Sequence, residues 1–121
     1  MNAARLLPLL GLTLSTSAIA ADLLPLKNGI YVPVGTACKG ASNAEMVNYW
    51  GGRSGIGVAQ ATCTIASISK KGSVYTYRDK CTDIQSGQAI AGGPTVVTVQ
   101  SATAFRMGGT AYRYCGPKVQ F

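Results

Sequence analysis

The chain has 121 residues with 11 lysines and arginines, four acidic residues and no histidine, which gives a formal net charge of +7. The lack of histidine removes the usual general base and excludes Ser-His and Cys-His catalytic arrangements. Asp79 and Asp83, which flank Cys81, would lie roughly 13 Å apart on a strand, too far for a glycosidase pair. We therefore expect a protein that is not an enzyme and that uses no cofactor or metal.

Residues 1–20 have the pattern of a secretory signal peptide. Arg5 supplies a short positive region, residues 6–14 form an interrupted apolar core, and Ala18-Ile19-Ala20 gives the small-x-small cleavage pattern. The apolar run is shorter than the roughly 20 residues that a stable membrane span needs. We therefore expect residues 21–121 to form one exported domain, periplasmic or secreted. Loss of Arg5 would lower its net charge from +7 to +6.

The first strand is predicted at residues 30–32. Asn28-Gly29 is a turn signal before it, and Pro33 ends the strand or restricts it to an edge. A loop carrying Cys38 follows at residues 35–40. The chain therefore enters the fold through a short strand and a loop that presents a cysteine.

Residues 42–45, Ser-Asn-Ala-Glu, match a capping box and predict one short helix near 43–49. The alternative is a strand that places Met46, Asn48 and Trp50 on one face. Trp50 is the only tryptophan, and we expect it to anchor the core, with an exposed contact role as the alternative.

The glycine-rich segment at residues 51–57 resembles a nucleotide-binding loop only in composition. It lacks the Gly-Lys-Ser/Thr ending of a P-loop and the strand-turn-helix setting of a dinucleotide fingerprint. We interpret it as a flexible surface loop. Because loops often carry function, Arg53 at its tip is a candidate contact residue.

The central feature is a hairpin at residues 62–83. Two runs of alternating β-branched and aromatic residues flank a Lys-Lys-Gly-Ser turn, where Gly72 can adopt the positive φ that a tight turn needs. Counting outward from the turn places Cys63 opposite Cys81 if one strand carries a bulge. A cross-strand disulfide between them is therefore geometrically possible.

Alternation separates the two faces of this hairpin. Tyr75 and Tyr77 are predicted to face the core, which argues against their stacking on nucleic-acid bases, whereas Arg78 and Lys80 face outward. Lys70 and Lys71 at the tip are either solvated turn residues or contacts for a partner.

After a loop at 84–93 with an extended stretch around 89–90, a strand is predicted at 95–100. A final hairpin pairs residues 105–107 with 110–114 across Gly108-Gly109, a favoured two-residue turn. In that register Phe105 and Tyr112 face each other inward, and Arg106 and Arg113 are diagonal neighbours on the outer face.

The four cysteines, at 38, 63, 81 and 115, predict two disulfides. Their gaps of 24, 17 and 33 residues, without histidine, do not fit a zinc site. We favour Cys63–Cys81 with Cys38–Cys115, and the main competitor is Cys38–Cys63 with Cys81–Cys115. Strands about ten residues apart with glycine turns predict an all-β fold, a small antiparallel sandwich or barrel.

Two resemblances bear on function. The spacing from Cys63 to Cys81, closed by Tyr112-Arg-Tyr-Cys115, resembles small exported Cys-paired β-domain proteins of Gram-negative bacteria, which have no established activity to transfer. In size and predicted architecture the chain is also similar to periplasmic lysozyme inhibitors of the small-barrel type. That family inserts a Ser-Gly-x-x-Tyr loop into the lysozyme cleft, whereas here Ser54-Gly55 has no tyrosine after it.

We expect a binding protein of the bacterial cell envelope, an inhibitor or immunity-type protein whose partner is another envelope protein. The alternatives are a binder of anionic envelope polymers and a structural accessory subunit. Seven cationic residues are candidate surface contacts. They are Arg53, Lys70, Lys71, Arg78, Lys80, Arg106 and Arg113.

Overall fold

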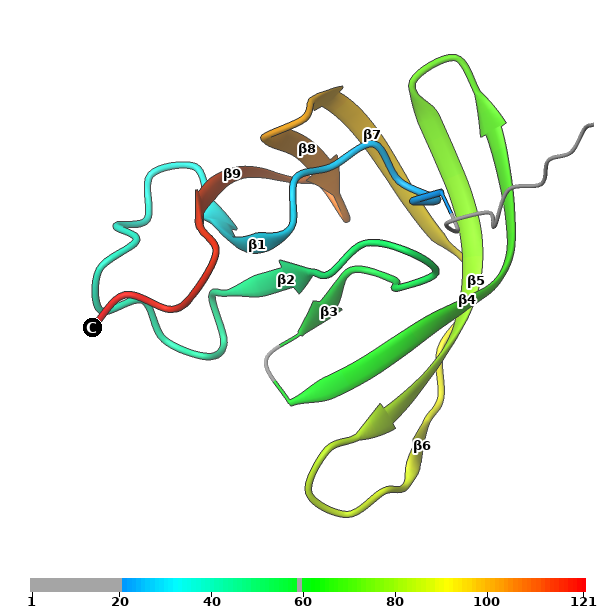
Figure 1. The fold of residues 1–121 in the computed structure, drawn as a ribbon, viewed down its shortest axis with the longest axis horizontal. Helices are drawn as coiled ribbons and strands as arrows, with labels where there is room; N and C mark the ends of the chain where they lie inside the picture. The colour runs from blue at the N-terminus through cyan, green and yellow to red at the C-terminus, as the bar shows by residue number, and fades with distance from the viewer. Residues whose placement is uncertain (1–20, 59) are drawn as a thin grey trace, which may run out of the picture.

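The computed structural model describes residues 21–58 and 60–121, so the predicted signal peptide lies outside the described residues. The described residues form strands and no helix, which confirms the predicted all-β class (Figure 1). The strands are β1 (Gly29–Pro33), β2 (Val47–Tyr49), β3 (Gly57–Val58), β4 (Ala61–Lys71), β5 (Val74–Asp83), β6 (Ala89–Ile90), β7 (Thr95–Ser101), β8 (Ala104–Met107) and β9 (Thr110–Gly116). Within these ranges no helix has the length and apolarity to cross a bilayer.

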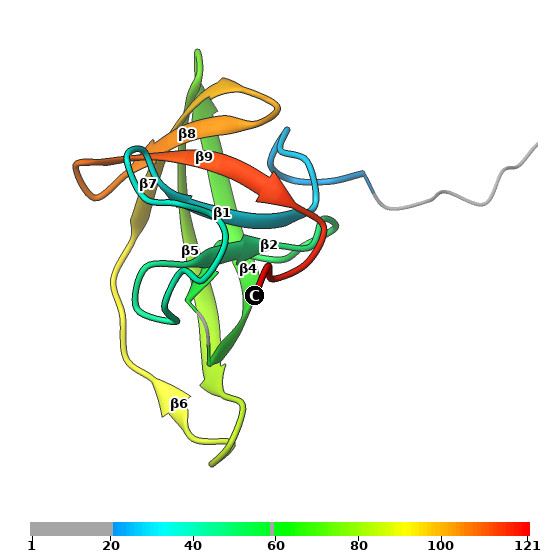
Figure 2. The same ribbon diagram turned by 90° about the vertical axis from the view of Figure 1, so that its left-hand side faces the viewer.

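The strands make one antiparallel sheet in the order β3-β2-β1-β9-β8-β7-β5-β4, with β6 paired to β5. The sheet curls until its two ends approach each other, and Figures 1 and 2 show the resulting nearly closed barrel. Residues 53–55 bridge the ends, because the Ile65 N–H donates to the Arg53 carbonyl at 2.7 Å and the Gly55 N–H to the Cys63 carbonyl at 3.1 Å. Closure leaves few unpaired edges, which are a liability in open sheets.

The barrel interior is filled by the inward-facing half of each strand. The largest fully buried side chains are Tyr31, Tyr49, Tyr77 and Phe105. The hydroxyl of each of these three tyrosines has a backbone partner, as buried polar groups require. Tyr31 donates to the Lys27 carbonyl at 2.7 Å, and Tyr77 accepts from the Ile56 N–H at 3.1 Å. Burial raises the pKa of both Tyr31 and Tyr77 to about 12, because the charged phenolate is poorly solvated there.

The lead-in to the first strand also contributes to the core. Leu24 is 0 % exposed and Leu26 is 5 % exposed, and both belong to the main hydrophobic cluster. The hydroxyl of Tyr49 donates to the Leu24 carbonyl at 3.0 Å, and the Lys27 N–H donates to the Ala102 carbonyl at 2.8 Å. Residues 23–27 therefore pack onto the barrel.

The central hairpin has the predicted register. Cys63 pairs with Cys81, Lys71 pairs with Val74 around a Gly72-Ser73 turn, and the register shifts between Ile65 and Ser67 as a bulge requires. The Cys63–Cys81 disulfide is present, with Cα atoms 4.1 Å apart. The second disulfide joins Cys38 to Cys115, which confirms the favoured pairing and rules out the competing one.

A second, smaller apolar cluster lies on the outer side of β1. Ile30, Val32 and Met46 are buried there against Cys38, Cys115 and Val119. The loop after β1 and the C-terminal tail cover this side, and the Cys38–Cys115 disulfide joins the two covering segments. Strand β1 is thus buried on both faces, whereas all residues of its neighbour β9 are half-buried.

The predicted helix near 43–49 is wrong. The capping interaction itself forms, because the Glu45 carboxylate accepts from the Ser42 N–H and hydroxyl, both at 3.0 Å. These two hydrogen bonds lower the pKa of Glu45. The segment makes one turn and then extends into β2, because the alternating residues Val47 and Tyr49 are buried in the main core. A strand was the alternative interpretation, and tertiary burial outweighs a local helix signal of this length.

The expectation that Trp50 anchors the core is also wrong. It follows β2 with its side chain directed outward, and 51 % of it is exposed. Because Tyr49 points into the core, strand alternation turns the next side chain, that of Trp50, to the surface.

Candidate binding surface on the outer face of the β4–β5 hairpin

The outer face of the β4–β5 hairpin carries three of the predicted contact residues. Lys71, Arg78 and Lys80 are exposed, whereas Tyr75 and Tyr77 on the same two strands are buried. The alternation follows from the pleat, which points successive side chains to opposite sides of the sheet. The hairpin therefore separates an apolar inner face from a cationic outer one, as predicted.

Strand pairing brings a fourth cation to this face. Lys71 pairs with Val74, Val74 with Thr98, and Thr98 with Arg106, so these four residues form one row across β4, β5, β7 and β8. Three strand spacings place Lys71 and Arg106 about 14 Å apart along that row. We call Lys71, Arg78, Lys80 and Arg106 the cationic face.

The cationic face has no carboxylate on the outward positions of these fully described strands. By register the outward residues of β4, β5, β7 and β8 are hydroxyl, amide, small apolar or cationic. Asp79 points the other way, toward Gly55 and Cys63. Asp83 accepts hydrogen bonds from the N–H groups of Gln85 and Ser86 at 2.8 and 3.0 Å. Positive charge on this surface is therefore not neutralised from the same face.

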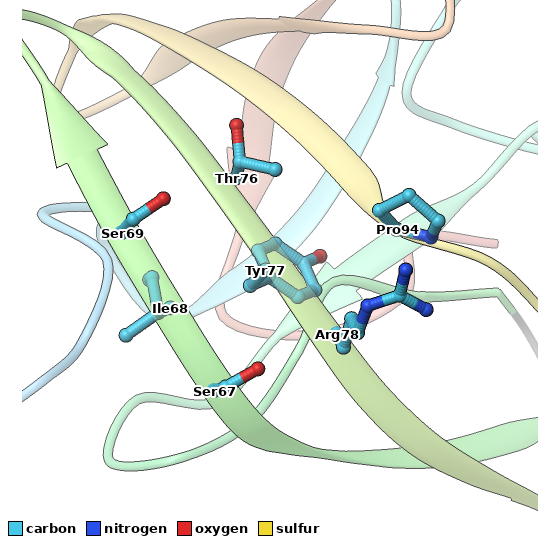
Figure 3. Close-up of a pocket in the computed structure, with 7 residues that line it drawn as sticks. All are labelled: Ser67, Ile68, Ser69, Thr76, Tyr77, Arg78 and Pro94. Carbon is cyan, nitrogen blue, oxygen red and sulfur yellow. The ribbon is translucent and has the colours of Figure 1, made fainter.

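Arg78 borders a shallow groove of about 440 Å³ on the hairpin (Figure 3). Ser67 is the register partner of Arg78, and Ser69 is the partner of Thr76, so three hydroxyls and one guanidinium share a face. Pro94, just before β7, forms the far wall. Hydroxyls can donate or accept, and a guanidinium offers a planar set of donors that matches carboxylate, sulfate and phosphate oxygens.

A second hollow of about 520 Å³ continues the groove toward the hairpin tip. It shares Ser69 and Thr76 with the first hollow and adds Lys70, Lys71 and Val74. We call the two together the hairpin groove. Arg78 lies at one end and Lys71 at the other, with hydroxyls between them, which suits an extended ligand that carries more than one anionic group.

The other three predicted contact residues point away from the cationic face or are engaged by the protein, although Lys70 also lines the second hollow. The ammonium of Lys70 lies over the ring of Tyr75, 5.6 Å from its centroid, on the opposite side of the tip from the pairing row. Arg113 is half-buried and donates from Nη2 to the Thr36 carbonyl at 2.6 Å. It is a diagonal neighbour of Arg106 as predicted, but it holds the loop after β1 in place.

Arg53 is exposed and stays a candidate contact, but the segment that carries it is hydrogen-bonded to β4 and is not a flexible loop as predicted. Its Nη2 donates to the Ile65 carbonyl at 2.9 Å, and its own carbonyl accepts from the Ile65 N–H. Ser54 forms a bridge with Thr64 in the same stretch. Gly55 permits a close approach to both strands of the hairpin, since an added Cβ would overlap the Asp79 carboxylate of β5 and lie 3.3 Å from the Cβ of Cys63 in β4.

Cys63, Asp79 and Cys81 bring three potential ligand atoms within 4.8 Å of one another. Both sulfurs are bonded to each other, so the group offers one carboxylate and no thiolate. Burial raises the pKa of Asp79, because the ionised carboxylate is partly removed from water. The group is thus a structural disulfide with an adjacent carboxylate.

The hydroxyls of Ser67, Ser69 and Thr76 were missed as site residues. Strand alternation places them on the same face as Arg78, and that signal was available in the sequence. The contribution of Pro94 was not accessible in this way, because it depends on how β7 aligns with β5.

No family model, curated protein or solved structure matches this chain. The two disulfides indicate a non-reducing compartment, extracellular or periplasmic, because cytosolic reductants keep most thiols reduced.

Proposed function

We propose that this chain is a non-catalytic binding protein of the bacterial cell envelope whose cationic face docks an anionic polymer. The observation that supports this most is the hairpin groove, where Arg78 and Lys71 flank three hydroxyls on a face without carboxylates. Polymers that bear phosphate, sulfate or carboxylate groups have the charge and the acceptor oxygens to match. The proposal takes up the polymer-binding alternative of the sequence analysis.

The spacing of the cations favours a polymer over a single small ion. Arg78 lies four residues from Val74, about 13 Å along β5, and Lys71 and Arg106 lie in the row that crosses Val74. Exposed charges separated by more than about 8 Å are screened from one another at physiological ionic strength. A ligand must therefore reach several cations at once to gain from all of them.

The proposal is tested by calorimetric titration of the oxidised protein with polyphosphate at low ionic strength. The triple variant Arg78→Gln, Lys80→Gln, Arg106→Gln removes three charges from the cationic face. A matched control, Lys27→Gln, Lys39→Gln, Lys118→Gln, removes three exposed charges elsewhere. We expect the face variant to bind at least tenfold more weakly and the control to stay within about threefold of wild type. An equal loss of affinity in both variants would mean that only the net charge of the protein matters, and would contradict binding at the cationic face.

A protein partner, as an inhibitor or immunity-type protein would have, is the second candidate. It is favoured by the projection of the hairpin tip past β7 and β8 in both views of the ribbon (Figures 1 and 2). The tip presents Lys71 and the partly exposed Val74. Affinity capture from a periplasmic extract, with muramidases tested individually, examines this candidate. A partner retained at high salt, and lost on shortening the tip, would favour it over the polymer.

A further inference from the structure

The molecule has a second concave site that shares no lining residue with the hairpin groove. It is a cleft of about 250 Å³ between the end of β2, residues 54 and 55, which bridge the two ends of the sheet, and the start of β4. Its accessible side chains are those of Asn48, Trp50, Ser54, Thr62 and Ile84. We call it the Trp50 cleft.

Two large apolar side chains at this cleft are exposed. Trp50 is 51 % exposed and Ile84 is 63 % exposed, so neither is placed there by the demands of the core. An exposed aromatic at the rim of a concavity provides a flat apolar surface for a ligand. The indole is therefore available for a contact that the fold itself does not use.

Hydrogen bonds to the backbone hold the walls of the Trp50 cleft in place. The Trp50 carbonyl accepts from the side-chain amide of Asn28 at 3.3 Å, and the Ile84 N–H donates to the Gln60 carbonyl at 2.9 Å. The Gly55 N–H donates to the carbonyl of Cys63, and the Cys63 side chain is held in the disulfide with Cys81. A site built on such elements exists before the ligand arrives, which lowers the entropy cost of binding.

The lining selects the ligand class by its chemistry. None of the side chains that line the Trp50 cleft carries a charge, and the nearby Asp79 carboxylate lies behind Gly55 and outside the lining, so charge is not the main basis for recognition there. The Asn48 amide and the Ser54 and Thr62 hydroxyls both donate and accept hydrogen bonds, and a purely apolar ligand would leave them unpaired. A neutral sugar ring offers hydroxyl groups at its edge for these partners and an apolar C–H face for the indole.

We propose that the Trp50 cleft binds one ring of a neutral saccharide, with the C–H face of the sugar against Trp50. The volume lies just below the usual range for small-molecule sites, roughly 300–1,000 Å³, which fits one ring with the rest of a chain outside. This proposal is independent of the polymer-binding function, because it uses different residues and no charge.

Trp50 allows a direct test, because it is the only tryptophan in the chain and its fluorescence reports on this cleft alone. The oxidised protein is titrated with three neutral trisaccharides, maltotriose, cellotriose and tri-N-acetylchitotriose, each to about 10 mM, a concentration at which a site with a Kd of about 1 mM is nearly saturated. We expect at least one trisaccharide to give a saturable change that added salt does not weaken. No saturable change with any of the three, or a change abolished by salt, overturns the proposal.

Two variants distinguish recognition from folding. Asn48→Ala and Thr62→Val each remove a polar partner, and we expect each to weaken binding of the active trisaccharide about tenfold while the urea midpoint stays close to that of wild type. Arg78→Gln, in the hairpin groove, is the control and should leave the affinity unchanged. If both cleft variants bind as well as wild type, or if Arg78→Gln weakens binding as much as they do, the cleft is not the site.

Discussion

Gly29 lies so close to Gly116 that an added Cβ would overlap the Gly116 carbonyl oxygen. This contact is where β1 meets the end of β9, next to Cys115 and its disulfide. Gly29 also has a φ of 143°, which side-chain-bearing residues rarely adopt. The position therefore joins the first and last strands and combines two separate requirements for glycine.

Gly29→Ala should lower the free energy of unfolding by about 3 kcal/mol, from backbone strain and overpacking together. Gly35→Ala is the matched control, because Gly35 has a φ of 99° but nothing within 4 Å of an added Cβ. It should cost about 1 kcal/mol from strain alone. Urea unfolding measures both. Equal costs for the two variants would contradict the close contact between β1 and β9.

The two disulfides should differ in what their removal costs. Cys38–Cys115 spans 77 residues and Cys63–Cys81 spans 18. In the chain-entropy account the long loop contributes about 4.5 kcal/mol and the short one about 3 kcal/mol. We expect Cys38→Ser with Cys115→Ser to destabilise the protein more than Cys63→Ser with Cys81→Ser. The reverse order in urea unfolding would show that the outer cluster around β1 does not depend on the long link.

Stability should fall in alkaline solution between pH 10 and about pH 12. The pKa of Tyr77 is raised from 10.0 to about 12, so in this window the unfolded chain loses a proton that the folded chain keeps. The contribution is complete below pH 10 and is lost as the pH rises through about 12, at up to about 1.4 kcal/mol per pH unit. The pH dependence of urea unfolding measures this slope.

Tyr77→Phe serves as the comparison for this alkaline prediction. It leaves the Ile56 N–H without its hydroxyl partner and should cost about 1–2 kcal/mol near neutral pH. Its slope above pH 10 should be shallower than that of wild type. A slope equal to that of wild type would mean that other groups account for the alkaline loss.

Asp79→Asn should stabilise the protein at pH 7, by less than about 1 kcal/mol because the group is only partly buried. Burial raises the pKa of this carboxyl, so the folded state favours its protonated form and the ionised form costs stability once the pH exceeds that raised value. This difference in stability between Asp79→Asn and the wild type should disappear near pH 3, where residue 79 is neutral in both proteins. Asp83→Asn is the comparison and should change stability little, because the asparagine Oδ1 can still accept the hydrogen bonds from Gln85 and Ser86. Stabilisation by both variants would point to a general charge effect.

Local patterns predict the parts of this fold that local physics decides. Alternation fixes the faces of β5, and the Gly108-Gly109 pair fixes the register that places Phe105 opposite Tyr112. The even cysteine count and the hairpin register together indicate Cys63–Cys81. These features depend on neighbours in sequence, so a single chain carries the information.

Features that depend on contacts distant in sequence were not predictable in this way. The burial of Leu24 depends on its place in the main core beside Tyr49, 25 residues away, and the pairing of Arg53 with Ile65 depends on closure of the sheet. The helix signal at Ser42 and Glu45 is satisfied in one turn, and the burial of Val47 and Tyr49 then makes the next residues a strand.

The candidate site likewise has one part that local patterns predict and one part that depends on distant contacts. Alternation places Arg78 and Lys80 outward, but the row from Lys71 to Arg106 requires the pairing of β5 with β7, which the sequence does not reveal.

The salt dependence of polyphosphate binding tests the central claim most directly. If the four residues of the cationic face contact the polymer, the logarithm of the affinity should fall with the logarithm of salt concentration with a slope of about −3. The triple variant of the cationic face, which retains Lys71, should give a slope of about −1, and the control variant should keep a slope near that of wild type. A slope near zero for wild type, or the same slope for all three proteins, would contradict a binding role for this face.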